Sequence, residues 1–313
     1  EQAALLRGWN QTYSQMSAGS FSGSFVEAEL GKADLFREIT SSSLHQTGVL
    51  PKGACAIGVP VRLAGSATFC GQACDGTQLH VFSGSSGFEF YSPSGLDIVG
   101  VVIEQEDFEA ALCDFELDRL AEPLAEAHLR KSAPADTARL RKLVLDGFEA
   151  MQNVPCPAGR LKIAPAIAAD VMSGLMQALA CCDTGGEMRI PPLKRWDVVR
   201  RARQLVAELP HELVSVEFIC SELGISRRAL QYCFQDTLGL APAAYLRAVR
   251  FNRARRAIKE GSSVTEAATL CGFWHFGRFS RDFRAMFGEL PSETARRVGV
   301  APRLAEPSAA AQA

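Results

Sequence analysis

The chain has 313 residues, of which 47% are hydrophobic and 22% are charged, and its formal net charge is −2. This composition is ordinary for a soluble folded protein of about two domains, which buries a large core without disulfides or metal ions. The longest unbroken aliphatic run, Ile98–Ile103, is too short to cross a bilayer, so we expect no membrane partner.

No charged-then-apolar leader opens the sequence, and the ten cysteines lack the paired C-x-x-C spacing of a zinc site. We therefore expect a cytoplasmic protein with reduced thiols, no metal and no cofactor. Adjacent Cys181 and Cys182 are the alternative candidate for a redox sensor, although inert thiols are the more ordinary interpretation.

The charge is unevenly distributed along the chain. Residues 1–193 carry 14 basic and 23 acidic residues, a net of −9, whereas residues 194–298 carry 18 basic and 11 acidic residues, a net of +7. A basic module joined to an acidic body is typical of a phosphate-binding domain attached to a domain that does not bind phosphate.

The acidic part begins with short runs of strand type. They are separated by Gly, Ser, Pro and Asp clusters every 8–12 residues, which predicts a β-sandwich or β-barrel over about residues 18–103. The runs are Phe21–Val26, Ala33–Leu44, Cys55–Leu63, Gln78–Phe82, Gly87–Tyr91 and Asp97–Ile103. Helical periodicity starts at Glu104. Trp9 lies far from these strands in sequence and is expected to be a packing residue.

Two amphipathic helices are predicted next, within residues 104–181. Their apolar stripes run from Leu140 to Met151 and from Ala164 to Leu179. These stripes either cover the barrel or also form a dimer, and the sequence leaves both open. We expect a first domain over 1–181, a linker over 182–194, a basic second domain over 195–298 and a disordered tail over 299–313.

The basic part contains a helix, a glycine turn and a second helix. Ser215 can cap the first helix, Gly224 supplies the positive φ that ends it, and Ser226 can cap the second. With Leu230 and Phe234 facing inward, long polar side chains remain outside: Arg227, Arg228, Gln231, Tyr232 and Gln235. Arginine pairs with guanine and glutamine with adenine in the major groove, so this unit is typical of DNA-binding helix-turn-helix proteins.

The same pattern recurs further along the chain, starting with a capping box at Ser263 and Glu266. Val264, Ala267, Ala268, Cys271 and Gly272 repeat Val216, Ile219, Cys220, Leu223 and Gly224 with a shift of 48 residues. Phe279, Phe283, Gly288 and Pro291 repeat Leu230, Phe234, Gly239 and Pro242 with a shift of 49 residues. Two copies in register within the basic segment indicate a double DNA-binding unit.

A helix over residues 243–259 joins the two units. It would be about 25 Å long, close to what is needed to place two recognition helices one DNA turn, about 34 Å, apart. Its arginines are candidates for phosphate contacts, and the alternative is a solvated charged face.

The segment Trp196–Arg297 resembles the C-terminal domain of the AraC/XylS family of bacterial transcription regulators. The resemblance lies in the repeated helix-turn-helix, the linking helix and a closing G-x-x-P-x-x-x-x-R formed by Gly288, Pro291 and Arg296. The strand pattern before it resembles the cupin-like sensor domain of many members. The resemblance implies an α+β chain with no enzyme activity: a β-barrel domain with following helices, then an all-α domain of two helix-turn-helix units.

The family's base-contacting positions fall on Arg227, Arg228, Gln231 and Tyr232 in the first unit, and on Phe276, Gly277, Arg278, Ser280 and Arg281 in the second. Phosphate contacts are expected from Arg247, Arg250, Arg253, Ser226 and His275. His275 stands where serine usually caps the helix, Gly277 costs about 1 kcal/mol of helix stability relative to alanine, and Thr294 replaces a usual aromatic. We therefore expect the first unit to carry most of the base specificity, with Arg278 and Arg281 chiefly positioning the second.

These observations predict a regulator of transcription, an activator rather than a repressor on family grounds, that binds double-stranded operator DNA. The resemblance also implies RNA polymerase as a partner, a homodimer, and a small effector or a protein partner at the N-terminal domain. One alternative is a cupin-type enzyme fused to a DNA-binding module, but His45 and His80 lack the H-x-H motif followed by Glu of a metal site. The other is a barrel that binds only protein, which a barrel filled by its own side chains would favour.

Overall fold

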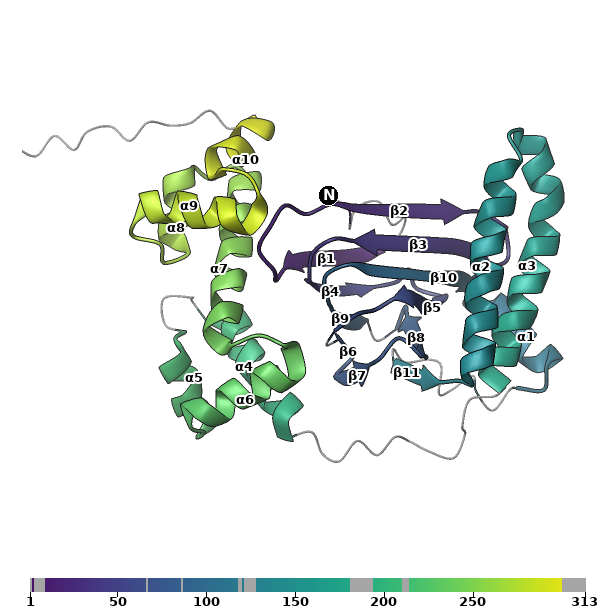
Figure 1. Cartoon of the computed structure of the whole chain (residues 1–313), viewed down its shortest axis with the longest axis horizontal. Coiled ribbons are helices and arrows are strands. Elements are labelled where there is room, and N and C mark those ends of the chain that lie inside the picture. Colours follow the sequence, from purple (N-terminus) through teal and green to yellow (C-terminus); the bar gives the residue numbers. More distant parts are fainter. Residues whose placement is uncertain are drawn as a thin grey trace, which may run out of the picture.

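The computed structural model describes residue 2 and residues 9–65, 67–85, 87–117, 120, 128–180, 194–209 and 214–299 (Figure 1). Three predicted features lie wholly or largely outside this part: the linker except for Lys194, the tail beyond Gly299, and the Cys181–Cys182 pair. The described residues form the predicted α+β chain, with antiparallel sheets first and a helical half after them.

The strands form two antiparallel sheets. Five strands lie in the order β1-β4-β9-β6-β7, and six lie in the order β11-β8-β5-β10-β3-β2. The bounds are Asn10–Gln15 (β1), Gly23–Ala28 (β2), Asp34–Thr40 (β3), Leu44–Val49 (β4), Ala54–Arg62 (β5), Ala67–Phe69 (β6), Gln72–Cys74 (β7), Gln78–Ser83 (β8), Phe88–Ser92 (β9), Leu96–Glu104 (β10) and His128–Lys131 (β11).

Side-chain alternation along the strands separates two cores. On β5, Ala54 and Ala56 belong to the core between the sheets, whereas Cys55, Ile57 and Val59 belong to the core that includes the following helices. Successive side chains of a strand point to opposite faces, so each sheet has one face toward the other sheet and one outer face.

The structure corrects several expected strand boundaries. The run Ala33–Leu44 is two strands, because the chain turns through residues 41–43 and β4 joins the other sheet. The predicted barrel range of 18–103 is too short at both ends: β1 precedes it, and β11 lies inside the segment expected to be helical. β1 and β11 are polar edge strands without a strong apolar signal, and β11 has only four residues.

The described part of the first half of the chain also contains α1 (Gln105–Asp114), between β10 and β11, and α2 (Pro134–Asn153) and α3 (Pro157–Ala180), after β11. The apolar stripes of α2 and α3 pack on the outer face of the six-stranded sheet. Among the described helices, α3 alone is long and apolar enough by composition to cross a membrane. Its residues Val171, Leu175 and Leu179 are buried in the core with the sheet, as in the core helix of a globular domain.

The second half of the chain is helical. Its helices are α4 (Lys194–Glu208), α5 (Val216–Leu223), α6 (Arg227–Leu238), α7 (Pro242–Lys259), α8 (Val264–Leu270), α9 (Phe276–Phe287) and α10 (Pro291–Arg297). Figure 1 shows the sheets between this half and the α2–α3 pair. Phe251 of α7 stacks on Phe273 and Phe279, so the linking helix anchors the core of the second helix-turn-helix unit.

Candidate nucleic-acid interface

The first helix-turn-helix unit is built by the predicted local signals. Ser215 accepts a hydrogen bond from the Phe218 amide at 3.0 Å, and Ser226 accepts one from the Ala229 amide at 3.1 Å. Gly224 between them has φ of 62°, a conformation that glycine adopts at no steric cost. These caps and this turn fix the start of α6, the first recognition helix.

The second unit repeats this construction up to the start of its recognition helix. Ser263 and Glu266 form the predicted capping box, with bonds of 2.9 and 3.2 Å between side chain and backbone. Gly272 turns the chain with φ of 75°. His275 stands at the N-cap of α9 without a side-chain capping bond, so the predicted departure from the serine cap is confirmed.

The side chains expected to contact bases lie mainly on the surface. The exposed residues are Arg227, Arg228, Gln231 and Tyr232 on α6 and Phe276, Gly277, Arg278 and Arg281 on α9, while Ser280 is half-buried. On α6, Arg227 pairs with Glu217 at 3.1 Å, and the Arg195 guanidinium lies 4.6 Å from the centre of the Tyr232 ring. Both recognition helices therefore present their first turns outward.

The residues expected to contact phosphate have different surroundings. Arg247 is exposed and pairs with Asp282 of α9 at 2.6 Å. Arg250 donates to the Val214 carbonyl at 2.9 Å, and Arg253 donates to the Val206 carbonyl at 2.5 Å; both are partly buried. Of the other two, His275 is exposed and the Ser226 hydroxyl serves as the cap of α6. The linking helix thus uses two of its arginines to hold preceding segments of the domain.

A groove of about 470 Å³ runs along α7 between the two units. Its lining includes Ser215, Arg247, Arg250, Trp274, His275 and Arg278. Trp274 and Asp282 were not among the residues expected at this site. Trp274 follows the Gly272 turn and is exposed, while Asp282 lies one helical turn after Arg278, at 3.5 Å from it. The spacing of Arg278 and Asp282, four residues apart on one helix, could have predicted this ion pair from the sequence.

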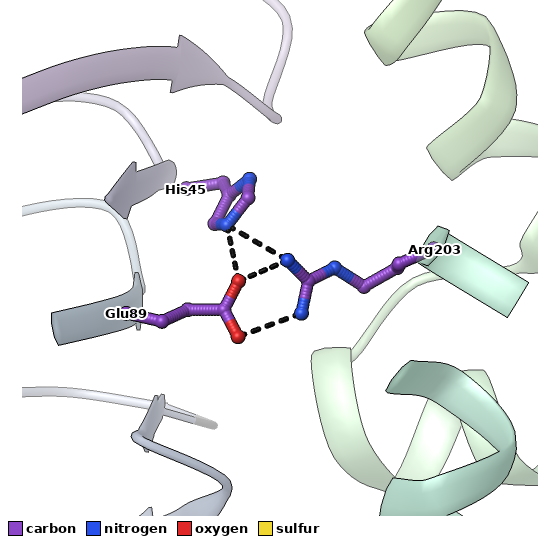
Figure 2. Close-up of polar contacts among 3 residues, drawn as sticks. All are labelled: His45, Glu89 and Arg203. Atoms are coloured by element: carbon purple, nitrogen blue, oxygen red, sulfur yellow. Dashed lines mark hydrogen bonds and ion pairs between the residues drawn. The ribbon is translucent and has the colours of Figure 1, made fainter. Parts of the chain in front are cut away.

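The helical half contacts the outer face of the five-stranded sheet through an ion-pair cluster (Figure 2). Arg203 of α4 donates from Nη1 to Glu89 Oε2 at 2.7 Å and from Nη2 to Glu89 Oε1. His45 of β4 lies 2.7 Å from Glu89 through Nε2, which assigns the donor proton to that nitrogen, and its ring stacks on Tyr91 with centroids 4.2 Å apart. The Arg203 and Glu89 side chains are only 15% and 20% exposed.

Burial sets the electrostatics of this cluster. Burial lowers the pKa of His45, and the positive charge of Arg203 lowers it further. The hydrogen bond with Glu89 acts in the opposite direction. Burial raises the pKa of Glu89, but the His45 bond and the Arg203 guanidinium outweigh it and hold this pKa below its usual value. The arrangement at neutral pH is therefore a neutral imidazole and a carboxylate paired with a guanidinium.

Hydrogen bonds extend this interface to both helix-turn-helix units. Thr68 of β6 donates to the Thr237 carbonyl of α6 at 2.8 Å. Gln15 of β1 exchanges two bonds with the Asn252 side chain of α7, at 2.7 and 3.0 Å, and its side chain donates to the Met286 carbonyl of α9 at 2.8 Å. The sheet therefore touches the C-terminal ends of both recognition helices and leaves their first turns exposed.

Aromatic side chains fill the space between the two sheets. Trp9 packs edge-to-face on Phe36, Phe82 and Phe88 at 5.6–6.0 Å, so it is a packing residue as expected but lies inside the sheets rather than far from them. Among the described residues, a cavity beside Trp9 and Phe82 measures about 10 Å³, close to the size of one water molecule.

Polar side chains are also buried in this interior, among them Glu38, Gln46 and His80. Glu38 accepts a bond from the Tyr13 hydroxyl at 2.5 Å, and burial raises the pKa of Glu38. The His80 ring is fully buried against Phe69 and Phe90, and burial lowers its pKa to about 3. The described residues contain no group of three or more His, Cys, Asp or Glu side chains that could hold a metal ion, and their eight cysteines are free thiols.

Comparison with known proteins agrees with this geometry. Residues 219–297 match the family model described as "Helix-turn-helix domain". The chain is 34% identical over 132 residues to the probable thc operon regulatory protein of Rhodococcus erythropolis, which covers 41% of this chain and 40% of that protein. It is 34% identical over 100 residues to the XylDLEGF operon transcriptional activator of Pseudomonas putida, which covers 31% of each chain. The matches therefore span less than half the length of these relatives.

A solved structure of a probable AraC family transcriptional regulator from Rhodopseudomonas palustris matches 33% of this chain and 97% of its own, at 35% identity and a TM-score of 0.31. The double helix-turn-helix geometry and the matched sequences make this chain a member of the AraC/XylS family through its C-terminal, DNA-binding domain.

Proposed function

We propose that this chain is a transcription regulator that reads operator DNA with both recognition helices. Bases are read by Arg227, Arg228, Gln231 and Tyr232 in one major groove and by Arg278, Ser280 and Arg281 in the next. The observation that carries the proposal is the pair of helix-turn-helix units, repeated in sequence, with exposed first turns on a domain of net charge +7. The name of the Pseudomonas relative, an operon activator, supports activation rather than repression.

The linking helix supports reading on one face of the duplex. α7 has 18 residues, about 27 Å at 1.5 Å per residue, and the widths of the two units add to this span. One turn of DNA is about 34 Å, so successive major grooves lie within reach. Arg247 and His275 border the groove between the units and would meet the intervening phosphates.

The test is binding of the full chain to duplexes selected from a randomised library. Neutralising about six phosphates makes affinity fall by about 10³-fold between 50 and 200 mM salt. Arg228→Ala should relax base preference in the selected sites more than Arg281→Ala. A salt-independent interaction, or a library from which no sequence is enriched, would overturn the proposal.

The N-terminal domain is proposed to regulate DNA binding through the Arg203–Glu89–His45 interface. An effector shifts a two-state equilibrium only if it binds one state better than the other. A pocket of about 170 Å³ between β6–β7 and α4–α6 is lined from both domains, including Thr68, Cys74, Trp196 and Asp236. A small effector bound there would contact both domains. It would therefore favour the arrangement described above, which we call closed, over an open arrangement in which the Arg203–Glu89–His45 interface is separated.

A protein partner is the second candidate for the input signal. Aromatic side chains pack between the described strands, and the cavity among them measures about 10 Å³, which favours a partner on the surface over a small molecule in the cupin-like interior. Thermal-shift screening of metabolites separates the two, because a ligand that binds only the native state raises the melting temperature. We propose no enzyme activity.

Assembly and location complete the proposal. We place the protein in the cytoplasm as a homodimer that recruits RNA polymerase, with the α2–α3 pair, within residues 134–181, as the dimer face. Leu161 on α3 is a large exposed apolar side chain that would be covered in such a dimer. Leu161→Glu should lower the mass measured by light scattering from that of a dimer to that of a monomer.

A further inference from the structure

The first turn of α9 carries an exposed aromatic side chain among basic ones. Phe276 is 44% exposed, and the preceding Trp274 is 66% exposed. The Arg278 and Arg281 side chains on the same helix are 69% and 76% exposed. A phenyl ring has no hydrogen-bonding group, so its favourable contact with a partner must be apolar.

Gly277, next to Phe276, is not required by its backbone conformation or by a close neighbour in the described chain. Its φ is not in the positive range, and a Cβ built on it meets no atom within 4 Å. Glycine costs about 1 kcal/mol in a helix relative to alanine, and nothing on the protein side requires it here. The backbone of α9 at Gly277 is therefore open to close approach from outside.

The charge around this turn indicates what kind of molecule could bind there. Asp282, on the next turn of α9, lies within 2.6–3.7 Å of Arg247, Arg278 and Arg281. One carboxylate therefore holds three guanidinium groups close together beside the exposed turn, with a net positive charge. A polyanion complements this surface, and duplex DNA combines phosphates with an accessible groove of bases.

We propose that Phe276 contacts a thymine methyl group in the major groove entered by α9, and that Gly277 lets the groove wall approach the helix. The C5 methyl of thymine is the apolar group that base edges present in the major groove. The other base edges there are donors and acceptors that a phenyl ring would desolvate without replacing their hydrogen bonds. This inference depends on the proposed function, since it names a base for the second unit.

The experiment replaces each thymine of a selected duplex by deoxyuridine, one position at a time. The change removes one methyl group and leaves base pairing intact. For the full chain we expect one position in the α9 half-site at which affinity falls about fourfold, the effect of exposing one methyl group. Phe276→Ala should bind the thymine and uracil duplexes equally. Leu270→Ala, which removes an exposed apolar side chain of α8 outside the recognition helix, should keep the fourfold difference.

The outcomes separate this inference from the function on which it rests. Failure to enrich any duplex overturns the proposed DNA binding itself. A sequence-specific complex with no uracil-sensitive position, or one whose sensitivity survives Phe276→Ala, overturns the thymine contact alone. Unchanged DNA binding of Phe276→Ala together with lost transcription would instead assign Phe276 to a protein partner and also overturn the contact.

Discussion

Arg203 of α4 and Glu89 of β9 form a two-pronged ion pair across the boundary between the helical half and the sheets. The pair is mostly shielded from water, and His45, Tyr91 and Trp196 surround it. Removing one partner of such a pair leaves the other charge desolvated, which costs more than the loss of a surface salt bridge. This contact is therefore the strongest single candidate for a switch between closed and open arrangements.

A double-mutant cycle measures the pair. Glu89→Ala and Arg203→Ala should each destabilise the chain, and the double variant should lose less than the sum, with a coupling of about 1–3 kcal/mol in the free energy of unfolding. Arg200→Ala is the matched control, because Arg200 on the same helix is exposed and pairs with Asp197 at 3.1 Å. That control should change stability by less than about 0.5 kcal/mol. Additive effects of the two variants would show that the pair does not couple the domains.

Acidification should open the interface through His45. Because burial and Arg203 lower its pKa in the closed form, the open form takes up a proton more readily, and closure weakens as pH falls below about 6.5. Protonation of Glu89 at lower pH should weaken the closed form further, since the pKa of Glu89 is also lowered in that form. The radius of gyration from small-angle X-ray scattering should rise between pH 7.5 and 5.5 at constant circular dichroism. His45→Gln should suppress this rise; an equal rise in that variant contradicts the assignment.

The buried His80 should limit stability rather than support it. Burial lowers the pKa of His80 to about 3, and a backbone contact with Gln78 opposes this shift only in part. The folded state therefore loses stability as pH falls below the ordinary histidine pKa near 6.5, because the unfolded chain binds the proton. His80→Leu should raise the unfolding free energy by about 1–2 kcal/mol at pH 7 and by more at pH 5, measured by urea denaturation. A destabilised variant at both pH values would argue that the ring is needed for packing against Phe69 and Phe90.

Gly277→Ala should separate folding from recognition. The added methyl group meets open space in the protein, so helix propensity alone predicts a gain of about 0.5–1 kcal/mol in the free energy of unfolding. The same methyl group faces the proposed groove wall, so affinity for the selected duplex should fall. Thermal unfolding and DNA titration of the same preparation provide both values, and a variant that is more stable with unchanged affinity would place the duplex away from Gly277.

The two helix-turn-helix units could be predicted because their signals are local. Ser215, Gly224 and Ser226 act on backbone groups within four residues, and the Ser263–Glu266 box is equally short-ranged. A second copy at nearly constant spacing then reinforced the first. Such caps and turns depend on sequence neighbours, so the sequence alone determines them.

The sheets and the interface depend on contacts between residues distant in sequence. β4 pairs with β1 and β9 rather than continuing β3; Ser41, Ser42 and Ser43 are typical of a loop, but they do not identify the new partner strands. His45 was considered a barrel residue and a poor metal candidate, yet its side chain faces Arg203, 158 residues away. Arg253, an expected phosphate contact, donates to the Val206 carbonyl, a bond that the sequence did not predict. In each case the residue type is compatible with several roles, and contacts with residues distant in sequence determine which role the residue has.

In the proposed complex, α6 and α9 enter successive major grooves on one face of a duplex. Hydroxyl-radical footprinting of the full chain on a selected duplex measures this placement. We expect two protected stretches separated by one helical turn, about 10–10.5 base pairs, with Arg228→Ala weakening one stretch and Arg281→Ala the other. A single protected stretch that both variants weaken equally would contradict it.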